Sequence, residues 1–504
     1  MPNSTSQIAR NTLLLYFRML LTMGVTLYTS RVILNALGVE DYGIYNVVGG
    51  VVAMFGILSG SLSSAISRFI TFELGKGDFE KLKRIFCTSV NIQIILIVII
   101  TVLMETVGIW FLNAKMVIPE GRLAAANWVF HFSVVTFALN LLSVPYNAVI
   151  IAHEKMSAFA YISVIDCTLI LIVAFIIPYN PIDKLIYYGL LIMIVGAINR
   201  SIYAIYCKRH FEEATYIMIF DKGLMKEMFG FAGWSFIGSS AVIFRDQGGN
   251  MILNLFFGPV VNAARGIAVQ INNALQCFVN SFMTALNPQI TKSYAQGDHE
   301  YMMKLIFIGS RYSFFLLLLL SLPVFFNTHF VLELWLTQVP EYSVVFVQLV
   351  MVLSLQDSLA NPLITAMLAT GNIKRYQIIA GGLNSLNLPV SYLLFRFGFS
   401  PEYLFIVAIV FSFLLTFVRL WLLQSLIHIN MVKYLKEVYL NVIFVTIIAI
   451  TIPLFLRYKM QESVQTFLIL SMITIISTVF AILFYGCKKE ERVVILKKVR
   501  GFLK

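Results

Sequence analysis

Apolar runs long enough to cross a membrane follow one another along almost the whole chain. Spanning the roughly 30 Å hydrocarbon core of a bilayer takes about 20 helical residues. Runs of this length lie near residues 10–37, 42–73, 85–112, 123–152, 157–178, 184–207, 227–257, 259–290, 304–335, 340–369, 375–397, 401–427, 435–456 and 463–486. Because 59% of the residues are hydrophobic and only 12% are charged, the composition is also far more apolar than that of a soluble domain. We therefore predict an all-α polytopic membrane protein with about fourteen transmembrane helices.

The lysines and arginines outside these runs are distributed unevenly between the two sides of the predicted membrane. The amino terminus, the carboxyl-terminal tail and every second connection hold 23 of them, and the opposite connections hold 6. Basic residues accumulate on the cytoplasmic side of membrane proteins. Both termini are therefore predicted to be cytoplasmic, and the net charge of +12 reflects topology rather than nucleic-acid binding.

The two halves of the chain are related by an internal duplication. A shift of 220 residues, without gaps, superposes one half on the other at the following pairs: Gly38 and Gly258, Ala65 and Ala285, Ile70 and Ile290, Thr71 and Thr291, Gly77 and Gly297, Asp78 and Asp298. A second similarity aligns Pro145 with Pro362. Two like-oriented bundles of six helices are implied, and transporters built from such repeats bind their substrate between the halves near the midplane. Convergent patterning of transmembrane segments is the alternative explanation.

This duplication predicts the domain organisation. We expect an amino-terminal six-helix bundle at 1–210, a cytoplasmic linker at 211–226 and a second six-helix bundle at 227–428. Two additional transmembrane helices would follow at 429–486. A basic cytoplasmic tail would end the chain at 487–504.

Eight arginines lie inside the predicted spans. They are Arg18, Arg31, Arg68, Arg200, Arg245, Arg265, Arg311 and Arg419. Facing lipid, they would cost on the order of 20 to 28 kcal/mol together, so they must pair, line water or reach the headgroups. Arg68, Arg200, Arg311 and Arg419 lie within a few turns of span ends, from where a long side chain can extend to the interface.

The stretch VIFRDQGGNMIL (242–253) places Arg245 and Asp246 side by side in a span. Because neighbouring side chains on a helix diverge by about 100°, we expect each to find its own partner, with Asp246 meeting Asn250 one turn on. The small residues on the face of Arg245, such as Gly248, would leave room for water or a ligand. Close packing of helices on these glycines, or a hinge, is the alternative.

The span at 259–290 carries a polar stripe on one face. Arg265, Asn272, Gln276, Asn280 and Asn287 fall within about 80° of one another on a helix. Such a face must contact protein or water.

Polar residues recur in the first span at Tyr28, Arg31 and Asn35. The arginines outnumber the intramembrane acids, so the interior is expected to be positive and to suit an anion. Arginine matches phosphate oxygens, and amide side chains can bind sugar hydroxyls. A buried structural network is the alternative for the whole set.

We assign the candidate site residues accordingly. The candidates for binding the phosphate oxygens of an anion are Arg31, Arg245, Arg265, Arg68 and Arg18. The candidates for lining the cavity and binding sugar hydroxyls are Tyr28, Asn35, Asn272, Gln276 and Asn280. Asp246 and Asp166 are candidates for coupling to an H⁺ or Na⁺ gradient, because an intramembrane carboxylate is a functional candidate by default. A structural salt bridge is the alternative role for both. We expect no cofactor, no metal and no catalytic residue, since HExxH, P-loop and GxSxG motifs and clustered Cys and His ligands are absent from the sequence.

Several of these segments resemble one known family. The stretches ILNALGVEDYGIYN, GKGDFEKLKR, AHEKM and FRDQGGNM before FFGPVVNAARG are similar to the polysaccharide transporter branch of the multidrug/oligosaccharidyl-lipid/polysaccharide exporter superfamily, which includes O-antigen flippases. The resemblance covers nearly the whole chain and implies a fold like that of the multidrug and toxin exporters of the same superfamily. It also implies that Arg31, Arg68 and Arg265 correspond to cationic cavity residues used against a pyrophosphate.

The function expected from the residues and the resemblance together is that of a flippase. It would move an undecaprenyl-pyrophosphate-linked oligosaccharide, such as an O-antigen, capsule or exopolysaccharide repeat unit, from the inner to the outer leaflet of the cytoplasmic membrane of a bacterium. Membrane lipids and the glycosyltransferases and glycan polymerase of the same pathway are the expected partners. A multidrug or cation antiporter of the same superfamily, and a membrane glycan polymerase or ligase, are the alternatives.

Overall fold

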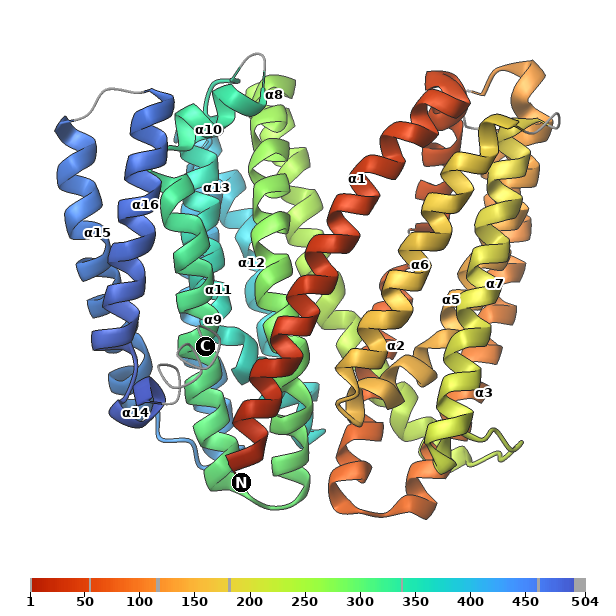
Figure 1. The fold of residues 1–504 in the computed structure, drawn as a ribbon, viewed down its shortest axis with the longest axis horizontal. Helices are drawn as coiled ribbons and strands as arrows, with labels where there is room; N and C mark the ends of the chain where they lie inside the picture. Colours follow the sequence, from red (N-terminus) through yellow and green to blue (C-terminus); the bar gives the residue numbers. More distant parts are fainter. Residues whose placement is uncertain are drawn as a thin grey trace, which may run out of the picture. The chain divides into compact units, whose positions relative to one another are not determined.

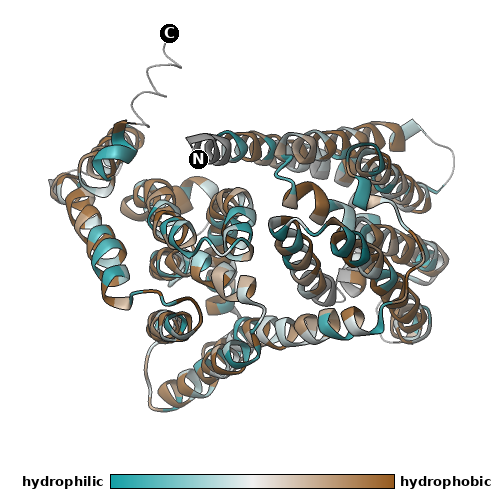
Figure 2. Cartoon of the chain, turned by 90° about the horizontal axis from the view of Figure 1, so that it is seen from below, coloured by the Kyte–Doolittle hydropathy of each residue, from teal (hydrophilic) through white to brown (hydrophobic). Residues whose placement is uncertain are grey.

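The computed structural model describes residues 2–53, 56–114, 118–179, 183–336, 339–459 and 463–493, and the regular elements of these segments are all helical (Figure 1). Hydrophobic residues predominate along the helices, with hydrophilic residues interspersed (Figure 2). The end of the predicted basic tail, residues 494–504, lies outside the described part. The chain divides into two compact units, residues 1–239 and 240–504.

The first unit contains seven α-helices and the start of an eighth. They are α1 (Pro2–Ala53), α2 (Gly56–Lys76), α3 (Phe79–Leu103), α4 (Ile109–Ala114), α5 (Leu123–Ala152), α6 (Met156–Ile176), α7 (Lys184–His210) and the start of α8 (Lys222–Ala295). The second unit contains the rest of α8 and the helices after it. These are α9 (His299–Phe326), α10 (Thr328–Trp335), α11 (Ser343–Thr370), α12 (Lys374–Arg396), α13 (Tyr403–Ile427), α14 (Met431–Tyr434), α15 (Asn441–Lys459) and α16 (Val464–Ala481).

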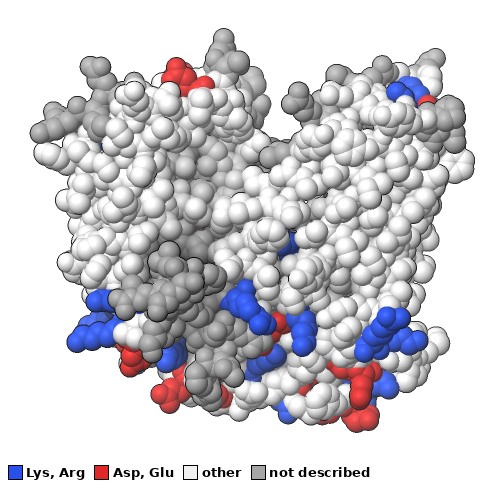
Figure 3. All heavy atoms as spheres, viewed as in Figure 1, with Lys and Arg blue, Asp and Glu red and all other residues white. Residues whose placement is uncertain are grey.

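The predicted fold class is confirmed. Among the described residues, 11 helical segments are long and apolar enough to cross a membrane. The other three predicted spans, 10–37, 42–73 and 259–290, are helical wherever the structure describes them. On the face drawn in Figure 3, most Lys and Arg side chains of each unit gather at one end of its helices.

The duplicated positions adopt matching backbone conformations. Gly38 and Gly258 break α1 and α8 with φ of 83° and 78°, and each break separates two predicted spans. Gly77 and Gly297 have φ of 78° and 75°. After these two glycines, Asp78 and Asp298 cap the next helices, each accepting from a backbone N–H at 3.0 Å. Pro145 and Pro362 both lie inside helices, α5 and α11. The shift of 220 residues therefore relates turns and caps as well as residue types.

Small residues bring helices close together inside each unit. In the first unit, a Cβ added at Gly189 of α7 would lie 3.3 Å from side-chain atoms of Val129 and Phe132 of α5. In the second, a Cβ at Gly309 of α9 would overlap Leu286 of α8 and lie 3.1 Å from Pro362 of α11. Because lipid tails supply little hydrophobic drive between helices, such close contact is what holds them together.

The last two helices pack on the second bundle. The guanidinium of Arg311 in α9 donates to the backbone carbonyl of Gly486 at 3.0 Å and to Glu491 Oε1 at 2.7 Å, both beyond the end of α16. The hydroxyl of Tyr434 donates to Ser310 Oγ at 2.9 Å and to the carbonyl of Leu359 at 3.0 Å. These hydrogen bonds hold α14 and the segment after α16 against α9 and α11.

An ionic cluster joins three segments of the first unit at the predicted outer side. Arg122 donates to Asp41 Oδ1 at 2.7 Å and to Asp183 Oδ1 at 3.2 Å, with a further bond to each carboxylate. Asp183 also caps α7 through the N–H groups of Leu185 and Ile186. Arg122 thereby ties the residues after Gly38 to the start of α7.

Acid should weaken this cluster. Burial raises the pKa of Asp183, but the bonds from Arg122 and the backbone outweigh it, so the pKa is held below the usual Asp range. Ionised Asp183 therefore stabilises the fold above about pH 4, and the contribution is lost as the pH falls through the folded-state pKa. Thermal unfolding of the purified protein, measured as a function of pH, should show this loss. D183N should have a lower unfolding midpoint than the wild type at neutral pH, and its midpoint should fall less steeply as the pH is lowered. Glu227→Gln, a change at an exposed carboxylate, serves as the control. If the unfolding midpoints of D183N and the wild type fell equally steeply with decreasing pH, the stabilising role of ionised Asp183 would be contradicted.

The turn at Gly258 should depend on its glycine. Gly258 has φ 78° and ψ −173°, a backbone conformation essentially confined to glycine in which a side chain costs about 1–3 kcal/mol, so Gly258→Ala should lower the thermal unfolding midpoint. Gly266→Ala, in the same helix and also with open space around its Cβ, should be neutral or stabilising by about 1 kcal/mol. Equal effects of the two changes would contradict the role of the turn.

Candidate functional site

The turn at Gly258 folds α8 into a helical hairpin that buries Arg265 against the preceding span. The guanidinium of Arg265 donates to Asn250 Oδ1, and its second terminal nitrogen donates to the backbone carbonyl of Asp246 at 2.9 Å. Arg265 is 8% exposed, and its Nε has no hydrogen-bond partner. One half of the hairpin thus supplies a buried cation, and the other half supplies neutral acceptors for it.

Arg245 lies in the same cluster and joins it to α12. Its Nε donates to Asp246 Oδ1 at 3.0 Å, and its Nη1 donates to Asn384 Oδ1 at 3.3 Å. The expectation that Arg245 and Asp246 would find separate partners is wrong, because the long arginine side chain bends around the helix to its neighbour. Asp246 does not use Asn250 as predicted, since the amide of Asn250 bonds Gln247 and Arg265.

Glycines set the spacing around this cluster. A Cβ added at Gly248 would overlap Leu388 of α12, and one at Gly381 of α12 would lie 3.6 Å from Ala241. The close-packing explanation therefore holds for Gly248, which leaves no room for water on that side. At Gly249 an added Cβ would lie 3.8 Å from Arg265 Nη2, an ordinary van der Waals contact, so Gly249 lies beside the guanidinium.

The cluster carries an excess of positive charge. Its ionic groups are two guanidiniums and one carboxylate, with Asn250 and Asn384 as neutral members. The side chain of Arg245 is 19% exposed and that of Asp246 is 50% exposed. Spare donors remain on both arginines, since Arg265 Nε lacks a partner and the hydrogen bonds of Arg245 use only two of its nitrogens. Such a cluster can bind an anion at its exposed edge and can exchange Asp246 for that anion.

The polar stripe on the second half of α8 divides between two environments. Asn272 accepts from Ser354 Oγ, and Asn287 accepts from Thr365 Oγ1 at 2.8 Å, so both bond to α11. Gln276 is half-buried and Asn280 is exposed. Among the predicted cavity-lining residues of this helix, Gln276 and Asn280 therefore keep accessible amides.

The predicted residues of the first unit lie apart from that cluster along the chain. Arg18 lies over the ring of Phe159 at 4.3 Å, and Arg68 lies over the rings of Phe69, Phe72 and Phe231. Tyr28 is half exposed and Asn35 is exposed. The side chain of Arg31 lies outside the described part of the structure.

Asp166, the second coupling candidate, lies in α6. Its carboxylate accepts a hydrogen bond from the amide of Asn199 in α7. The side chain is half-buried, and its described partner is neutral. A carboxylate with a neutral partner remains available for protonation or for a cation.

Two of the other arginines have structural roles. Arg311 and Arg419 are 2% and 7% exposed, so the expectation that they reach the headgroups is wrong. Arg311 pairs with Glu491, and Arg419 donates to the hydroxyl of Tyr376 at 3.3 Å. Arg200 lies over the ring of Tyr146 at 4.2 Å.

Sequence reasoning missed the contribution of α12 to the site. Asn384 was not selected, although an asparagine inside an apolar span is itself a signal of polar contact. It also missed a network near Arg419, in which Gln356 donates to the hydroxyl of Tyr439 at 2.7 Å and Ser412 donates to Asp357. Within the part of the chain that the structure describes, no group of three or more His, Cys, Asp or Glu side chains could hold a metal ion.

Comparison with known families gives two matches. Residues 8–294 match the family described as "Polysaccharide biosynthesis protein", and residues 244–393 match the family MatE. The "Uncharacterized membrane protein EpsK" of Bacillus subtilis (strain 168) is 22% identical over 286 residues, which are 56% of this chain and 56% of that protein. The match therefore spans little more than half the length of that relative.

The fold is that of solved transporters. An outward-facing multidrug resistance MATE family transporter of the MOP superfamily matches with a TM-score of 0.72 at 12% identity, covering 84% of this chain and 96% of that one. A MOP superfamily transporter from Pyrococcus furiosus Vc1, described as having a binding pocket of reversed polarity, matches with a TM-score of 0.70 at 13% identity over the same shares. At these identities the likeness extends to the fold alone.

The contact at Gly248 can be tested by a double-mutant cycle. Gly248→Ala should destabilise the protein by about 1–3 kcal/mol through overpacking, and Leu388→Ala should destabilise it through a cavity. The combination should cost at least 0.5 kcal/mol less than the sum, about the smallest coupling expected of residues in contact. Chemical unfolding of the purified variants measures this, with Gly382→Ala in α12, where the Cβ meets open space, as control. Strict additivity would remove the packing role of Gly248.

Proposed function

We propose, from the premise that this chain belongs to the polysaccharide transporter family of the multidrug/oligosaccharidyl-lipid/polysaccharide exporter superfamily, that it is a flippase for a lipid-linked oligosaccharide. Its substrate is an undecaprenyl-pyrophosphate-linked O-antigen, capsule or exopolysaccharide repeat unit. It moves this substrate from the inner to the outer leaflet of the bacterial cytoplasmic membrane by alternating access.

The observation that carries the proposal is the pair of guanidiniums in the membrane-spanning part of the second unit. Arg245 bonds the carboxylate of Asp246, and Arg265 bonds the backbone carbonyl of the same residue, so two guanidiniums adjoin one acidic side chain. A diphosphate offers several anionic oxygens, and guanidinium groups bind such oxygens in a fork that lysine cannot reproduce. A family of polysaccharide transporters together with an excess of arginine favours an anionic lipid-linked substrate.

Each residue of the cluster has a distinct role in this proposal. Arg265 supplies a buried positive charge and its spare Nε–H. Arg245 is held by Asp246 in the absence of substrate and exchanges that carboxylate for a diphosphate oxygen when substrate arrives. Protonation of Asp246, or a bound Na⁺, would release Arg245, and this would couple an ion gradient to substrate binding. Asp166, bonded to neutral Asn199, is the coupling candidate of the first unit.

The remaining predicted residues serve the rest of the substrate. The accessible amides of Gln276 and Asn280, together with Asn35 and Tyr28, are proposed to contact the glycan. Arg31, Arg68 and Arg18 are proposed to add positive charge for the diphosphate. Glycosyltransferases that build the substrate and a polymerase that consumes it are the proposed partners.

A multidrug or cation antiporter is the second candidate function. The MatE match at residues 244–393 and the likeness to multidrug transporters favour it. An exporter of organic cations is expected to bind its substrate with acidic groups, whereas the cluster around Arg265 has more cations than anions. Efflux of organic cations that depends on Asp246 would support this alternative.

The arginines provide the test of the proposed flippase. In cells that lack the wild-type gene, R265A, R245A and R31A should each lower surface glycan and accumulate the lipid-linked precursor. Loss of one charge-assisted hydrogen bond, worth about 1.5–3 kcal/mol, should slow transport roughly tenfold to a hundredfold. R265K should recover only part of the activity, because lysine keeps the charge without the fork.

The matched control is Arg375→Ala. Arg375 belongs to the same unit but lies over Trp421 at 5.0 Å, away from the cluster. It should leave glycan export unchanged, and the abundance of every variant in the membrane is measured alongside. Normal surface glycan in all three alanine variants would refute the assignment of a lipid-linked diphosphate substrate.

A further inference from the structure

A short segment between α7 and α8 displays large apolar side chains outside any membrane-spanning helix. Residues 215–221 are not helical. Within them Ile217 is 47% exposed, Met218 is 79% exposed and Phe220 is 59% exposed. Three consecutive or nearly consecutive apolar side chains that contact so little protein mark an interaction surface rather than a core.

The segment is held firmly against the first unit. The side chain of Asn91 in α3 donates to the carbonyl of Ile219 at 2.7 Å and accepts from the hydroxyl of Tyr216 at 2.7 Å. The backbone N–H of Ile217 donates to Cys87 Sγ at 3.4 Å. The apolar side chains are therefore presented by a fixed backbone.

The same segment is also anchored at its beginning. The short 3₁₀ helix Glu212–Ala214 precedes it, and Glu213 contacts His153 Nε2 at 2.5 Å. The ring of His153 stacks on Phe211, with ring centroids 4.3 Å apart. These contacts bind the segment to the carboxyl end of α5 and fix its orientation on the first unit.

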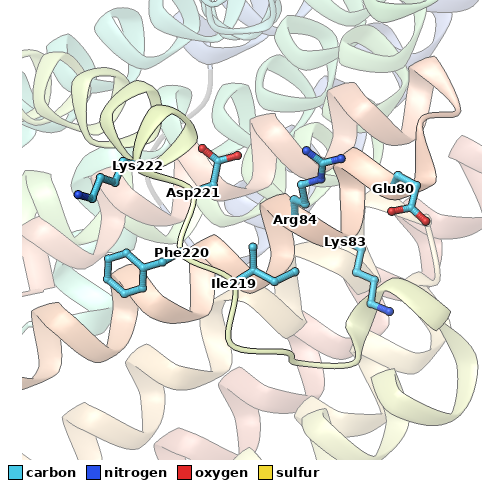
Figure 4. A pocket seen from close by; sticks show the side chains of 7 residues that line it. All are labelled: Glu80, Lys83, Arg84, Ile219, Phe220, Asp221 and Lys222. Carbon is cyan, nitrogen blue, oxygen red and sulfur yellow. The ribbon is translucent and has the colours of Figure 1, made fainter.

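Basic residues lie beside the apolar ones. An open pocket of about 610 Å³ lies between the start of α3, which supplies Glu80, Lys83 and Arg84, and residues 219–222 (Figure 4). Asp221 is committed to capping α8, since it accepts from the N–H of Leu224 at 2.9 Å. The pocket is therefore lined by three cations, Lys83, Arg84 and Lys222, and by one uncommitted acid, Glu80.

We propose that Ile217, Met218 and Phe220, together with Lys83, Arg84 and Lys222, form a docking surface for anionic phospholipids of the leaflet at this end of the protein. We call this set the linker surface. The apolar side chains enter the boundary between headgroups and acyl chains, and the cations bind the phosphates. Long lysine and arginine side chains keep their charges at the headgroups while their stems lie along apolar surface.

Charge complementarity selects lipid as the occupant. The side of the membrane predicted to face the cytoplasm carries anionic lipids, and each lysine near such a surface strengthens binding by a factor of about five. The linker surface adjoins the start of α3, close in the chain to two further lysines, Lys76 at the end of α2 and Lys81 in the first turn of α3. A protein partner is the other possible occupant, and the experiment separates the two.

Thiol labelling of the full-length protein in lipid nanodiscs tests the proposal. Met218→Cys is placed in a Cys277→Ser background, because Cys277 is the exposed cysteine and the other four are buried. A water-soluble maleimide should label Cys at 218 several-fold more slowly than Cys at the exposed position 212 (Glu212→Cys). The difference should grow when phosphatidylglycerol replaces part of the phosphatidylcholine, because the anionic headgroups attract the cations.

The lysines supply the second arm of the experiment. Lys83→Gln and Lys222→Gln should each restore labelling at 218 about fivefold in phosphatidylglycerol discs, and Lys83→Arg and Lys222→Arg should preserve the protection. The site at 212 reports any effect of membrane charge on the reagent itself. Equal labelling of the two sites in both kinds of disc would overturn the proposal and leave the linker surface to a protein partner. If labelling at position 218 were equally slow with and without phosphatidylglycerol, the role of the cations would be overturned.

Discussion

A guanidinium inside a membrane must find its acceptors within the protein, and the second unit is arranged around that requirement. Arg265 has five N–H donors and no water in the hydrocarbon region to accept from them. Its acceptors come from the preceding span, which the turn at Gly258 returns alongside it. The absence of a side chain at Gly248 allows Leu388 of α12 to approach this span. The turn at Gly258 and the amide of Asn250 together satisfy one buried charge.

The intramembrane arginines divide by the kind of partner they have. Arg311 and Arg419 are buried in networks that hold helices of the second unit together. Arg18, Arg68 and Arg200 lie over aromatic rings, which attract the cation without neutralising it. Arg245 bonds the carboxylate of Asp246 and the amide of Asn384, and Arg265 bonds the amide of Asn250. This pair combines two guanidiniums with one half-exposed carboxylate, so it is suited to an external anion.

The fold could be predicted from the sequence more completely than the site. Span-length apolar runs and repeated glycines are local signals, and the structure places Gly38, Gly258, Gly77 and Gly297 at the turns that the duplication implies. The pairing of Arg245 with Asp246 could not be predicted, because it depends on how a flexible side chain bends rather than on the direction of its Cβ. The role of Asn384 could not be predicted for a related reason. It depends on the packing of α12 against the span that holds Arg245, through the contacts at Gly248 and Gly381.

The central claim is that the buried guanidiniums recognise the diphosphate of a lipid-linked oligosaccharide during transport. Reconstituted vesicles that contain a fluorescent lipid-diphosphate oligosaccharide measure this directly, as the rate at which the glycan becomes accessible to a glycosidase on the opposite side. The account predicts transport by the wild type, competition by the matching unlabelled lipid diphosphate but not by a lipid with the same glycan and no phosphate, and loss of transport in R265A. Equal competition by the phosphate-free lipid, or wild-type rates in R265A, would contradict it.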